Sequence, residues 1–260
     1  MDLELTGRRA LVTGATRGIG RAIAGRLATE RCALAICARD GDEVARVAEE
    51  LRARGVPVHG GAVDVTDAPA LERFVAEAGD ALGGLDLLVA NAGGSAGAER
   101  VEDASAEDWR TTLDLNVVHA AIATRAAVPL MRAGGGGAIV FVASISGSRP
   151  QPRAQYAAAK AAEIHLAVSL GRELGPDGIR VNAISPGSIL FPGGGWDRRR
   201  QSDTESFERW VRAEFPLGRL GTVDEVADVA CFLLSPRASW ISGTNVVVDG
   251  AQNQPGMAGW

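Results

Sequence analysis

Seven short apolar runs, separated by longer stretches of helical periodicity, constrain the fold of this chain more than any other feature. The first run, Arg9–Thr13, precedes a predicted helix over Gly18–Ala28, so the two form a βα unit. The other predicted strands are Ala33–Cys37, Val56–Val63, Leu85–Ala90, Ala138–Ala143, Ile179–Ser185 and Asn245–Val248. Runs without polar alternation suit strands buried on both faces, and an alternating βα order specifies a parallel sheet between helices. We therefore predict an α/β fold with a doubly wound, seven-stranded parallel sheet.

Length and composition fit one domain. The 260 residues are 46% hydrophobic and 23% charged, which is enough apolar material for one core and carries no signature of disorder. We expect a single domain over residues 1–260. Between Ser188 and Phe215 the strand and helix pattern breaks down, and we interpret residues 188–215 as a mobile lid over the substrate.

Charge and cysteine content narrow the partners and the compartment. A net charge of −5 argues against nucleic acid and membrane surfaces, which call for basic faces. The start Met1–Glu4 lacks the regions of a signal peptide, and apolar runs such as Leu85–Ala92 are far too short to span a bilayer. Because Cys32, Cys37 and Cys231 form no C-x-x-C pair, we expect neither a disulfide framework nor a zinc site. These features predict a cytoplasmic protein.

A glycine-rich loop follows the first predicted strand and opens the first helix. The run Thr13–Gly20 has the spacing G-x-x-x-G-x-G, which lets backbone N–H groups and the positive helix end face a pyrophosphate. A purely structural glycine turn has a similar sequence. The loop Gly93–Gly97 also follows a strand, and ligands of doubly wound sheets bind at these carboxyl ends. The run Gly134–Gly137 leads into a strand instead, so we interpret it as a turn at the opposite edge.

Tyr156, the only tyrosine of the chain, precedes Lys160 by four residues in a strongly helical run. The two side chains therefore share one helix face. A phenol, with an ordinary pKa of about 10, is a poor base at neutral pH, and an adjacent ammonium favours its ionised form. Such a pair is common on structural helices, but here Ser144 follows the strand Ala138–Ala143 at the edge that carries the glycine loop. In this context we predict proton transfer by Tyr156, with Ser144 holding the substrate oxygen.

The run Thr13–Gly20 and the pair Tyr156 and Lys160 together resemble the short-chain dehydrogenase/reductase superfamily. Its hallmark at the first βα turn is Thr-Gly-x-x-x-Gly-x-Gly, and the resemblance covers nearly the whole chain. It implies a Rossmann-type fold that binds NAD(P). The family pattern also favours Ser144 over Ser146, which is a rival for the same role.

The resemblance assigns many residues to the coenzyme cleft. The expected cofactor-binding residues are Gly14, Thr16, Arg17, Gly18, Ile19, Gly20, Arg39, Asp64, Val65, Asn91, Ala92, Gly93, Tyr156, Lys160, Pro186, Gly187 and Ile189. Asp64 and Val65 would flank the adenine, whereas the residues alone make Asp64 a helix N-cap ahead of Thr66. Pro186–Gly187 resembles the turn beside the nicotinamide. Many members place a threonine soon after this turn, and Ile189–Pro192 departs from that pattern.

The choice between NAD and NADP depends on charge after the second strand. An acid there accepts the ribose 2′-OH, whereas an arginine binds a 2′-phosphate. Family members that prefer NAD usually carry the acid at the position of Ala38. Members that prefer NADP carry a small residue followed by an arginine, as in Ala38 and Arg39 of this chain. We therefore predict NADP, with Arg17 either as a second cation or as a solvated surface side chain. Asp40 leaves NAD open.

Asn116 stands in a helical stretch where asparagine is disfavoured. The resemblance implies that it bends the helix and holds a water that links Lys160 to solvent; the alternative is a surface asparagine. The resemblance also implies a homo-oligomer, a tetramer or a dimer, formed through the helices of Asn116 and Tyr156 and the last strand. The tail Gln254–Trp260 ends in apolar residues, so we expect it to dock on protein.

Aromatic and basic side chains mark the predicted lid. Its aromatic residues are Phe191, Trp196, Phe207 and Trp210. They suggest an apolar or cyclic substrate in contact with Trp196, or they pack the lid onto the body or a neighbouring subunit. The triplet Arg198–Arg200 would suit an acyl-carrier partner, or it is merely solvated.

We therefore predict an oxidoreductase that transfers a hydride between NADP(H) and a ketone or secondary alcohol. The substrate is either 3-oxoacyl-like or a cyclic or apolar carbonyl compound. The predicted catalytic residues are Asn116, Ser144, Tyr156 and Lys160, and the predicted substrate contacts are Ser144, Tyr156 and Trp196. A non-catalytic NADP-binding sensor or scaffold on the same fold is the alternative. Related enoyl reductases space tyrosine and lysine further apart. The histidines His59, His119 and His165 lack ligand spacing, so we expect packing or surface roles and no metal.

Overall fold

The computed structural model describes residues 1–252 of the chain. The prediction that the tail Gln254–Trp260 docks on protein lies outside these residues. Within residues 1–252, the helices are all too short or too polar to cross a lipid bilayer. Cys32, Cys37 and Cys231 are all buried as free thiols.

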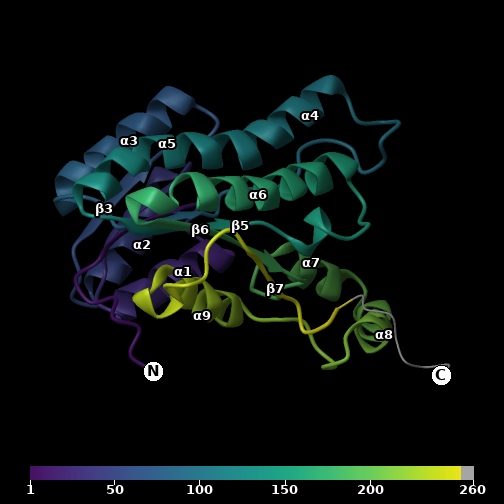
Figure 1. The fold of residues 1–260 in the computed structure, drawn as a ribbon. Coiled ribbons are helices and arrows are strands. Elements are labelled where there is room, and N and C mark those ends of the chain that lie inside the picture. Colours follow the sequence, from purple (N-terminus) through teal and green to yellow (C-terminus); the bar gives the residue numbers. More distant parts are fainter. Residues whose placement is uncertain (253–260) are drawn as a thin grey trace.

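A seven-stranded parallel sheet runs through the centre of the molecule (Figure 1). Its strand order is β3-β2-β1-β4-β5-β6-β7, and every neighbouring pair is parallel. The strands are β1 (Arg9–Thr13), β2 (Ala33–Ala38), β3 (Val58–Ala62), β4 (Leu87–Ala90), β5 (Gly137–Val142), β6 (Ile179–Pro186) and β7 (Asn245–Val248). The order reverses between β1 and β4, which is the topological switch point of a doubly wound sheet. The predicted Rossmann-type α/β fold is confirmed.

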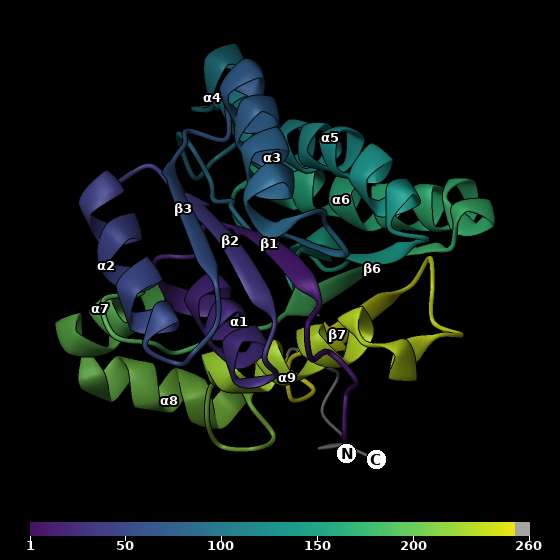
Figure 2. The ribbon, with the colours of Figure 1, turned by 90° about the vertical axis from the view of Figure 1, so that its left-hand side faces the viewer.

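Helices cover both faces of the sheet because alternate strand residues point to opposite sides (Figure 2). In β1, Ala10 and Val12 join one apolar core, and Leu11 joins the other. The first core is closed by α1 (Gly18–Thr29), α2 (Gly41–Arg52) and α9 (Val223–Leu234). The second is closed by α3 (Ala68–Leu82), α5 (His119–Ala133) and α6 (Ala154–Glu173). The sheet is therefore buried on both faces, as its unbroken apolar runs predict.

Strand ends differ from the sequence prediction where apolar residues are buried without pairing. The third strand begins at Val58 rather than Val56, because Pro57 has no N–H to donate to the ladder. The fourth begins at Leu87, although Leu85 is completely buried. The run Gly134–Gly137 makes the turn into β5, as expected. Hydrophobicity thus locates the strands but overestimates their lengths.

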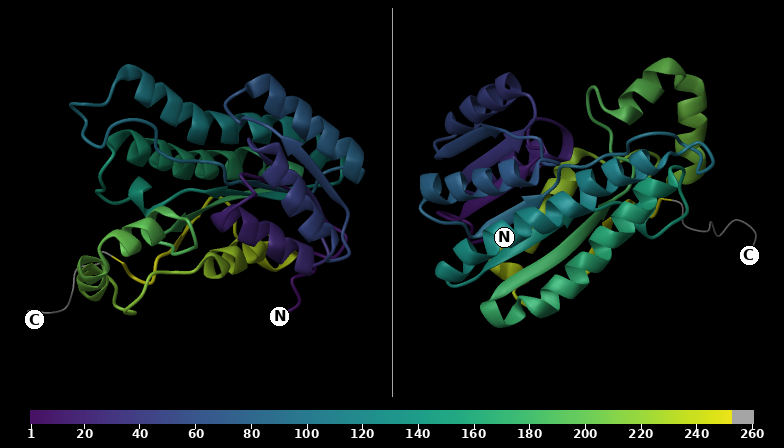
Figure 3. Two further views of the ribbon diagram at one scale, coloured as in Figure 1. Left: turned by 180° about the vertical axis from the view of Figure 1, so that it is seen from behind. Right: turned by 90° about the horizontal axis from the view of Figure 1, so that it is seen from above.

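The segment from Ser188 to Phe215 contains two helices rather than an irregular chain, α7 (Gly195–Ser202) and α8 (Thr204–Glu214). They stand beside the body of the molecule (Figure 3). Their apolar side chains form a small core of their own around Phe207 and Phe215. At the base of this segment, Leu190 N–H donates to the Gly221 carbonyl at 2.8 Å, and Gly221 N–H donates to the Ser188 carbonyl at 3.0 Å. The segment is therefore an ordered substructure anchored to the loop before α9.

Candidate active site

A cleft of about 1050 Å³ opens at the carboxyl ends of the strands. This volume lies at the upper end of the range for small-molecule sites. Its lining contains all the residues predicted to bind the coenzyme, from Gly14 to Ile189, and also Ser144 and Trp196. Of the predicted site residues, only Asn116 is outside the lining, because it is completely buried. Spacing in the sequence therefore identified residues that the fold brings together.

The glycine loop between β1 and α1 is shaped for close backbone approach. Gly14 and Gly18 have φ angles of +65° and +55°, in the left-handed region that favours glycine. The first residue before the helix, Arg17, is extended, and no side chain caps the helix. The N–H groups at the start of α1 therefore remain available to an anion in the cleft. A pyrophosphate fits this arrangement.

Asn91 ties the end of β4 to the glycine loop. Its side-chain amide donates to the Thr13 and Gly14 carbonyls at 2.9 and 3.0 Å. Thr13 Oγ1 in turn accepts from the backbone N–H groups of Asn91 and Ala92, both at 3.0 Å. A Cβ at Gly20 would lie 2.3 Å from the Asn91 amide nitrogen, so only glycine fits there. These contacts fix the cleft floor where the strand order reverses.

Two side chains of opposite charge follow β2, Arg39 and Asp40. Arg39 is exposed, as is Arg17, and neither guanidinium forms an ion pair within the described part of the chain. Asp40 caps α2, and its carboxylate accepts from the backbone N–H groups of Asp42 and Glu43 at 3.1 Å. Both arginines can therefore reach an anion at this end of the cleft, while the acid is already bonded.

Asp64 is not a helix N-cap, contrary to the interpretation from the residues alone. The N-cap of α3 is Asp67, whose side chain accepts from the Ala70 N–H. Asp64 instead closes a turn, accepting from Thr66 N–H at 3.0 Å and from its hydroxyl at 2.7 Å. These hydrogen bonds, together with the charge of Arg39, lower the pKa of Asp64 against the opposing effect of burial. The helix starts later because Asp67 and the proline after it supply the cap and the first turn.

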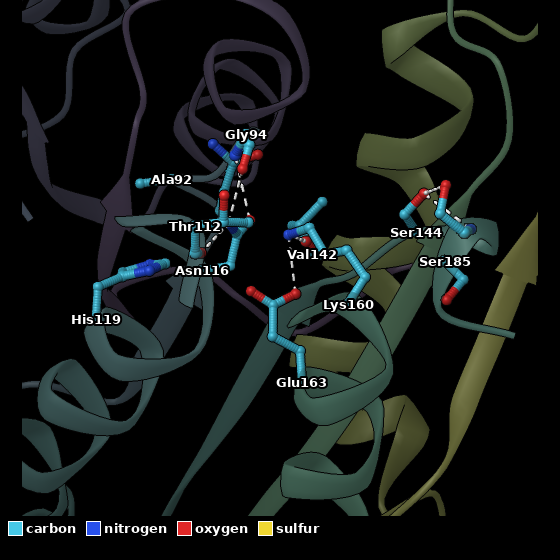
Figure 4. Close-up of polar contacts among 12 residues, drawn as sticks. Ala92, Gly94, Thr112, Asn116, His119, Val142, Ser144, Lys160, Glu163 and Ser185 are labelled. Carbon is cyan, nitrogen blue, oxygen red and sulfur yellow. Dashed lines mark hydrogen bonds and ion pairs between the residues drawn. The ribbon is translucent and has the colours of Figure 1, made fainter. Parts of the chain in front are cut away.

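Ser144 begins the 3₁₀ turn Ile145–Gly147 directly after β5. Its Oγ accepts from the Ser146 N–H and donates to the Ser146 hydroxyl, both at 3.1 Å (Figure 4). Ser144 lines the cleft, whereas Ser146 is absent from the lining. Ser146 therefore orients the hydroxyl of Ser144 rather than competing with it for a ligand.

Lys160 is buried beside the partly buried Tyr156 on α6. Its Nζ lies 5.7 Å from the centroid of the tyrosine ring, and it donates to the Val142 carbonyl and to Glu163 Oε2, both at 2.9 Å (Figure 4). Burial acts against the charged form of Lys160. The charges of Glu163 and Tyr156 and the hydrogen bond to Glu163 outweigh it, so the pKa of Lys160 lies above its usual value. A fixed ammonium therefore stands next to the phenol.

Asn116 lies in a π-helical turn, Asp114–Val118, which joins α4 (Ala106–Leu113) to α5. Its amide donates to the Gly94 carbonyl at 2.8 Å and to the Thr112 carbonyl at 2.6 Å, and its oxygen accepts from the Gly94 N–H at 3.2 Å. The α-helical pattern is interrupted at this residue by the π-helical turn, and the alternative of a surface asparagine is wrong because the residue is buried. A Cβ at Gly93 would lie 2.7 Å from Asn116 Oδ1 and 3.0 Å from Lys160 Nζ. The loop after β4 thus brings these two polar groups to one point.

His119 follows this turn directly and is buried. Of the two roles predicted for it, packing and surface, it therefore has the packing role. Its Nε2 lies 3.5 Å from Thr13 Oγ1. Burial, and then the charge of Lys160, lower the pKa of His119 to about 3. The ring is therefore neutral at physiological pH. Within residues 1–252, His, Cys, Asp and Glu side chains do not gather in threes or more at a site for a metal ion.

The turn after β6 closes the far side of the cleft. Gly187 N–H donates to the Val248 carbonyl at 2.9 Å, and a Cβ at Gly187 would lie 2.7 Å from that of Asp249. Ser188 pairs with Gln252 through its N–H at 2.7 Å and its hydroxyl at 2.9 Å. The departure from the family pattern after Pro186 is therefore accompanied by a tightly packed turn.

The aromatic residues of the predicted lid divide between packing and cleft. Phe191 packs on the first core, and Phe207 belongs to the separate core of the lid. Trp196 lines the cleft, and its ring stacks on Trp210 with centroids 4.6 Å apart. The guanidinium carbon of Arg199 lies over both indole rings, 5.5 Å from the centroid of Trp196 and 5.0 Å from that of Trp210. Of the four aromatic residues, Trp196 and Phe191 can face a ligand, and the other two hold the lid together.

Glu163 is the site residue that sequence reasoning missed. It is 1% exposed and bonded to Lys160, and its second oxygen, Oε1, has no partner in the described part of the chain. Burial raises the pKa of Glu163 to about 7, against the charge and hydrogen bond of Lys160. The spacing of three residues from Lys160 was the available signal, because such pairs share a helix face.

Comparison with known proteins identifies the family of this chain. A family described as "Enoyl-(Acyl carrier protein) reductase" matches residues 14–252. The chain is 36% identical to isoepoxydon dehydrogenase patN of Penicillium expansum, over 95% of each chain. It is 37% identical to dehydrogenase/reductase SDR family member 4 of Homo sapiens, over 95% of this chain and 87% of the human protein.

Solved structures give the same result. A 7α-hydroxysteroid dehydrogenase complexed with NADH and 7-oxo glycochenodeoxycholic acid superposes with a TM-score of 0.89 at 33% identity, over 98% of this chain and 97% of that one. The L-sorbose reductase of Gluconobacter frateurii, complexed with NADPH and L-sorbose, gives 0.91 at 33% identity, over 98% and 100%. With a cleft that fits a dinucleotide and relatives of this kind along nearly its full length, the chain belongs to the short-chain dehydrogenase/reductase family of NAD(P)-dependent enzymes that act on alcohol and carbonyl groups.

Proposed function

We propose that this enzyme transfers a hydride between NADP(H) and a ketone or secondary alcohol, with Tyr156 as the acid and base. The observation that carries the proposal is the placement of Ser144, Tyr156 and Lys160 on the wall of the same cleft as the glycine loop. A coenzyme along that cleft and a carbonyl group beside the phenol would therefore be neighbours. The four-residue spacing of Tyr156 and Lys160 favours carbonyl chemistry over enoyl reduction.

The side chains divide the chemistry among them. The nicotinamide, when bound, supplies the hydride for reduction and accepts it in oxidation. Tyr156 gives a proton to the carbonyl oxygen during reduction and takes it back during oxidation. The hydroxyl of Ser144 would turn from Ser146 to donate a hydrogen bond that holds this oxygen, and the ammonium of Lys160 stabilises the phenolate. Asn116 is proposed to hold the water that connects Lys160 to solvent.

NADP is the proposed coenzyme because the cleft carries two cations without ion-pair partners, whereas Asp40 uses one of its oxygens to cap a helix. Arg39 and Arg17 are exposed beside the cleft and suit a 2′-phosphate. Asp40, which could accept a ribose hydroxyl in an NAD enzyme, is occupied in capping α2. The compared structures contain both coenzymes, NADH in one and NADPH in the other, so the preference rests on these residues.

A cyclic or apolar carbonyl compound is the proposed substrate. Leu115, Phe191 and Trp196 present apolar surface to the cleft. Two of the compared proteins, an isoepoxydon dehydrogenase and a 7α-hydroxysteroid dehydrogenase complexed with 7-oxo glycochenodeoxycholic acid, also support this substrate class. The triplet Arg198–Arg200 supports an acyl-carrier partner less well, because Arg199 covers indole rings and Arg200 pairs with Asp197 at 2.8 Å. Residues 188–215 are proposed to close over this substrate.

We further propose that the enzyme is a cytoplasmic homo-oligomer. Exposed apolar side chains lie where the family resemblance places subunit contacts: Val118 beside Asn116, Val168 on α6, and Val247 on the edge strand β7. Trp240, shortly before β7, is 100% exposed. A tetramer or dimer would bury these side chains.

The experiment that tests this function is a coenzyme assay with purified protein. NADPH and NADH are each mixed with a panel of cyclic ketones, linear ketones and 3-oxoacyl thioesters, and nicotinamide absorbance is followed. We expect turnover of a ketone with NADPH at a higher kcat/KM than with NADH. Binding of NADPH without turnover in either direction would favour a sensor instead.

A further inference from the structure

We propose that Glu163 is a positioning residue, whose carboxylate keeps the ammonium of Lys160 charged and fixed beside the phenol of Tyr156. The inference deepens the proposed function and rests on it. Glu163 lies one helical turn after Lys160, on the face of α6 that points into the protein. None of the catalytic steps uses this carboxylate directly. We explain the buried position of Glu163 by its contact with the ammonium of Lys160.

The enclosure of the pair is the first support. Lys160 and Glu163 expose 3% and 1% of their side chains, and Nζ lies 2.9 Å from Oε2. A buried ammonium without a counter-charge loses its proton, because desolvation penalises the charged form. The Val142 carbonyl fixes one N–H of the ammonium but carries no net charge. Glu163 therefore supplies the negative charge that stabilises the protonated form of Lys160.

Among the described residues, Lys160 forms an ion pair with Glu163 and with no second carboxylate. On its own helix, the ionisable neighbours are Tyr156 and Glu163, and α5 contributes His119, which is neutral above a pH of about 3. Among the strands packed against α6, the one ionisable side chain is Arg180, which donates to the Leu233 and Ser235 carbonyls. The helical segments packed against α6 carry the exposed Glu107, Arg110 and Asp114, the helix-capping Asp108, and Asp177, which pairs with Arg132. Within the described residues, Glu163 is therefore the carboxylate paired with Lys160, and Tyr156 is the other group whose charge raises the pKa of Lys160.

The geometry of the pair leaves one side of the ammonium unoccupied. Only one carboxylate oxygen reaches the ammonium, and Figure 4 shows the other on the opposite side, towards Asn116 and His119. The third N–H of Lys160 is left for the cleft that it lines. The carboxylate therefore holds Nζ from the side away from the cleft and leaves the cleft side of Nζ free.

The test is the pH dependence of carbonyl reduction by Glu163→Gln, with the ketone that the panel identifies. Removing the negative charge lowers the proton affinity of Lys160. We expect the descending limb of log kcat to move to lower pH by about one unit or more. At a pH above the wild-type limb the variant would lose about tenfold in kcat, while well below that limb it would stay within about threefold of the wild type. The KM for the ketone would be unchanged.

The matched control is Glu173→Gln, which removes an exposed carboxylate at the end of the same helix. Its profile would match that of the wild type. If Glu163→Gln does not fold, Glu163→Asp carries the test, because retraction by one methylene is expected to move the limb in the same direction by less.

A descending limb that stays in place in both variants would overturn the inference, as would an equal loss of kcat at every pH, which is what a purely structural role produces. Absence of turnover in the wild type would instead refute the proposed function and leave these curves unmeasurable. The two failures are therefore distinct.

Discussion

At the residue scale, burial drives two ionisable neighbours of Lys160 towards their neutral forms. It raises the pKa of Glu163 to about 7 and lowers that of His119 to about 3. The ammonium opposes the change at Glu163 and reinforces it at His119, because opposite charges attract and like charges repel. A neutral His119 beside a charged Lys160 is the consistent arrangement at neutral pH.

The neutral state of His119 predicts an acid-sensitive contribution to stability. The folded chain resists protonation until a pH of about 3, whereas the unfolded chain takes up this proton near pH 6.5. Stability is therefore complete above pH 6.5 and is lost as pH falls towards 3, by about 1.4 kcal/mol per unit. Between pH 7 and pH 5, urea unfolding of the wild type should show a loss of about 2 kcal/mol that His119→Gln lacks.

The exposed His165 on α6 supplies the control. The difference in unfolding free energy between the wild type and His165→Gln should stay constant over this pH range. A constant difference for His119→Gln as well would show that the buried ring carries a proton in the folded state.

Residue identities at the cleft were predictable where spacing encodes a function. The glycines, Tyr156 and Lys160 stand at fixed intervals, and the cleft contains all of them. Glu163 was missed because a glutamate three residues after a lysine is equally common on solvated helices. Only burial, which depends on the helices and strands packed around α6, separates the two cases.

At the element scale, the π-helical turn between α4 and α5 sets the position of Asn116. One extra residue in the turn directs the amide inwards to the loop after β4, where it bonds to Gly94 and Thr112. The loop is held to the helix by a side chain rather than by strand pairing. The same loop carries Gly93, which contacts Lys160.

Asn116→Ala should therefore destabilise the protein. The Gly94 N–H and carbonyl would lose their partner in a partly buried place, at a cost of about 1–3 kcal/mol in the free energy of unfolding. Urea denaturation of both proteins measures the difference. Asp114→Ala, which alters an exposed residue of the same turn, should change stability by less than about 0.5 kcal/mol. Equal effects would mean that the amide bonds contribute nothing specific.

Elements were predictable wherever apolar periodicity was unbroken, and less so in the lid. All seven strands were located, whereas α7 and α8 were not predicted. The glycines around Pro192 and the arginine triplet hide α7. The spacing of Phe207, Trp210 and Val211 on α8 is nevertheless typical of an amphipathic helix. Their side chains are buried against one another rather than against the sheet, which a search for sheet-covering helices overlooks.

At the scale of the whole molecule, the proposed assembly makes Trp240 an interface residue. An indole that is 100% exposed on one chain costs little to remove in a monomer but much in an oligomer. Light scattering of the wild type should give a multiple of the 26.9 kDa chain mass. Trp240→Glu should weaken subunit association by about 30-fold or more.

Val101→Glu is the control, because Val101 is 65% exposed in the loop before α4, away from the proposed contact faces. It should leave the mass unchanged. A monomeric wild type, or an unchanged mass for Trp240→Glu at high dilution, would contradict the proposed interface.

The central claim, that Tyr156 exchanges the proton with the reacting oxygen, is tested most directly by Tyr156→Phe. Because the chain has one tyrosine, this change removes its only phenol. NADPH binding is followed by fluorescence, and kcat is measured with the ketone that the wild type reduces. The predicted result is a variant that still binds NADPH but has a kcat lower by a factor of about 10²–10⁴. A kcat within about twofold of the wild type would contradict it.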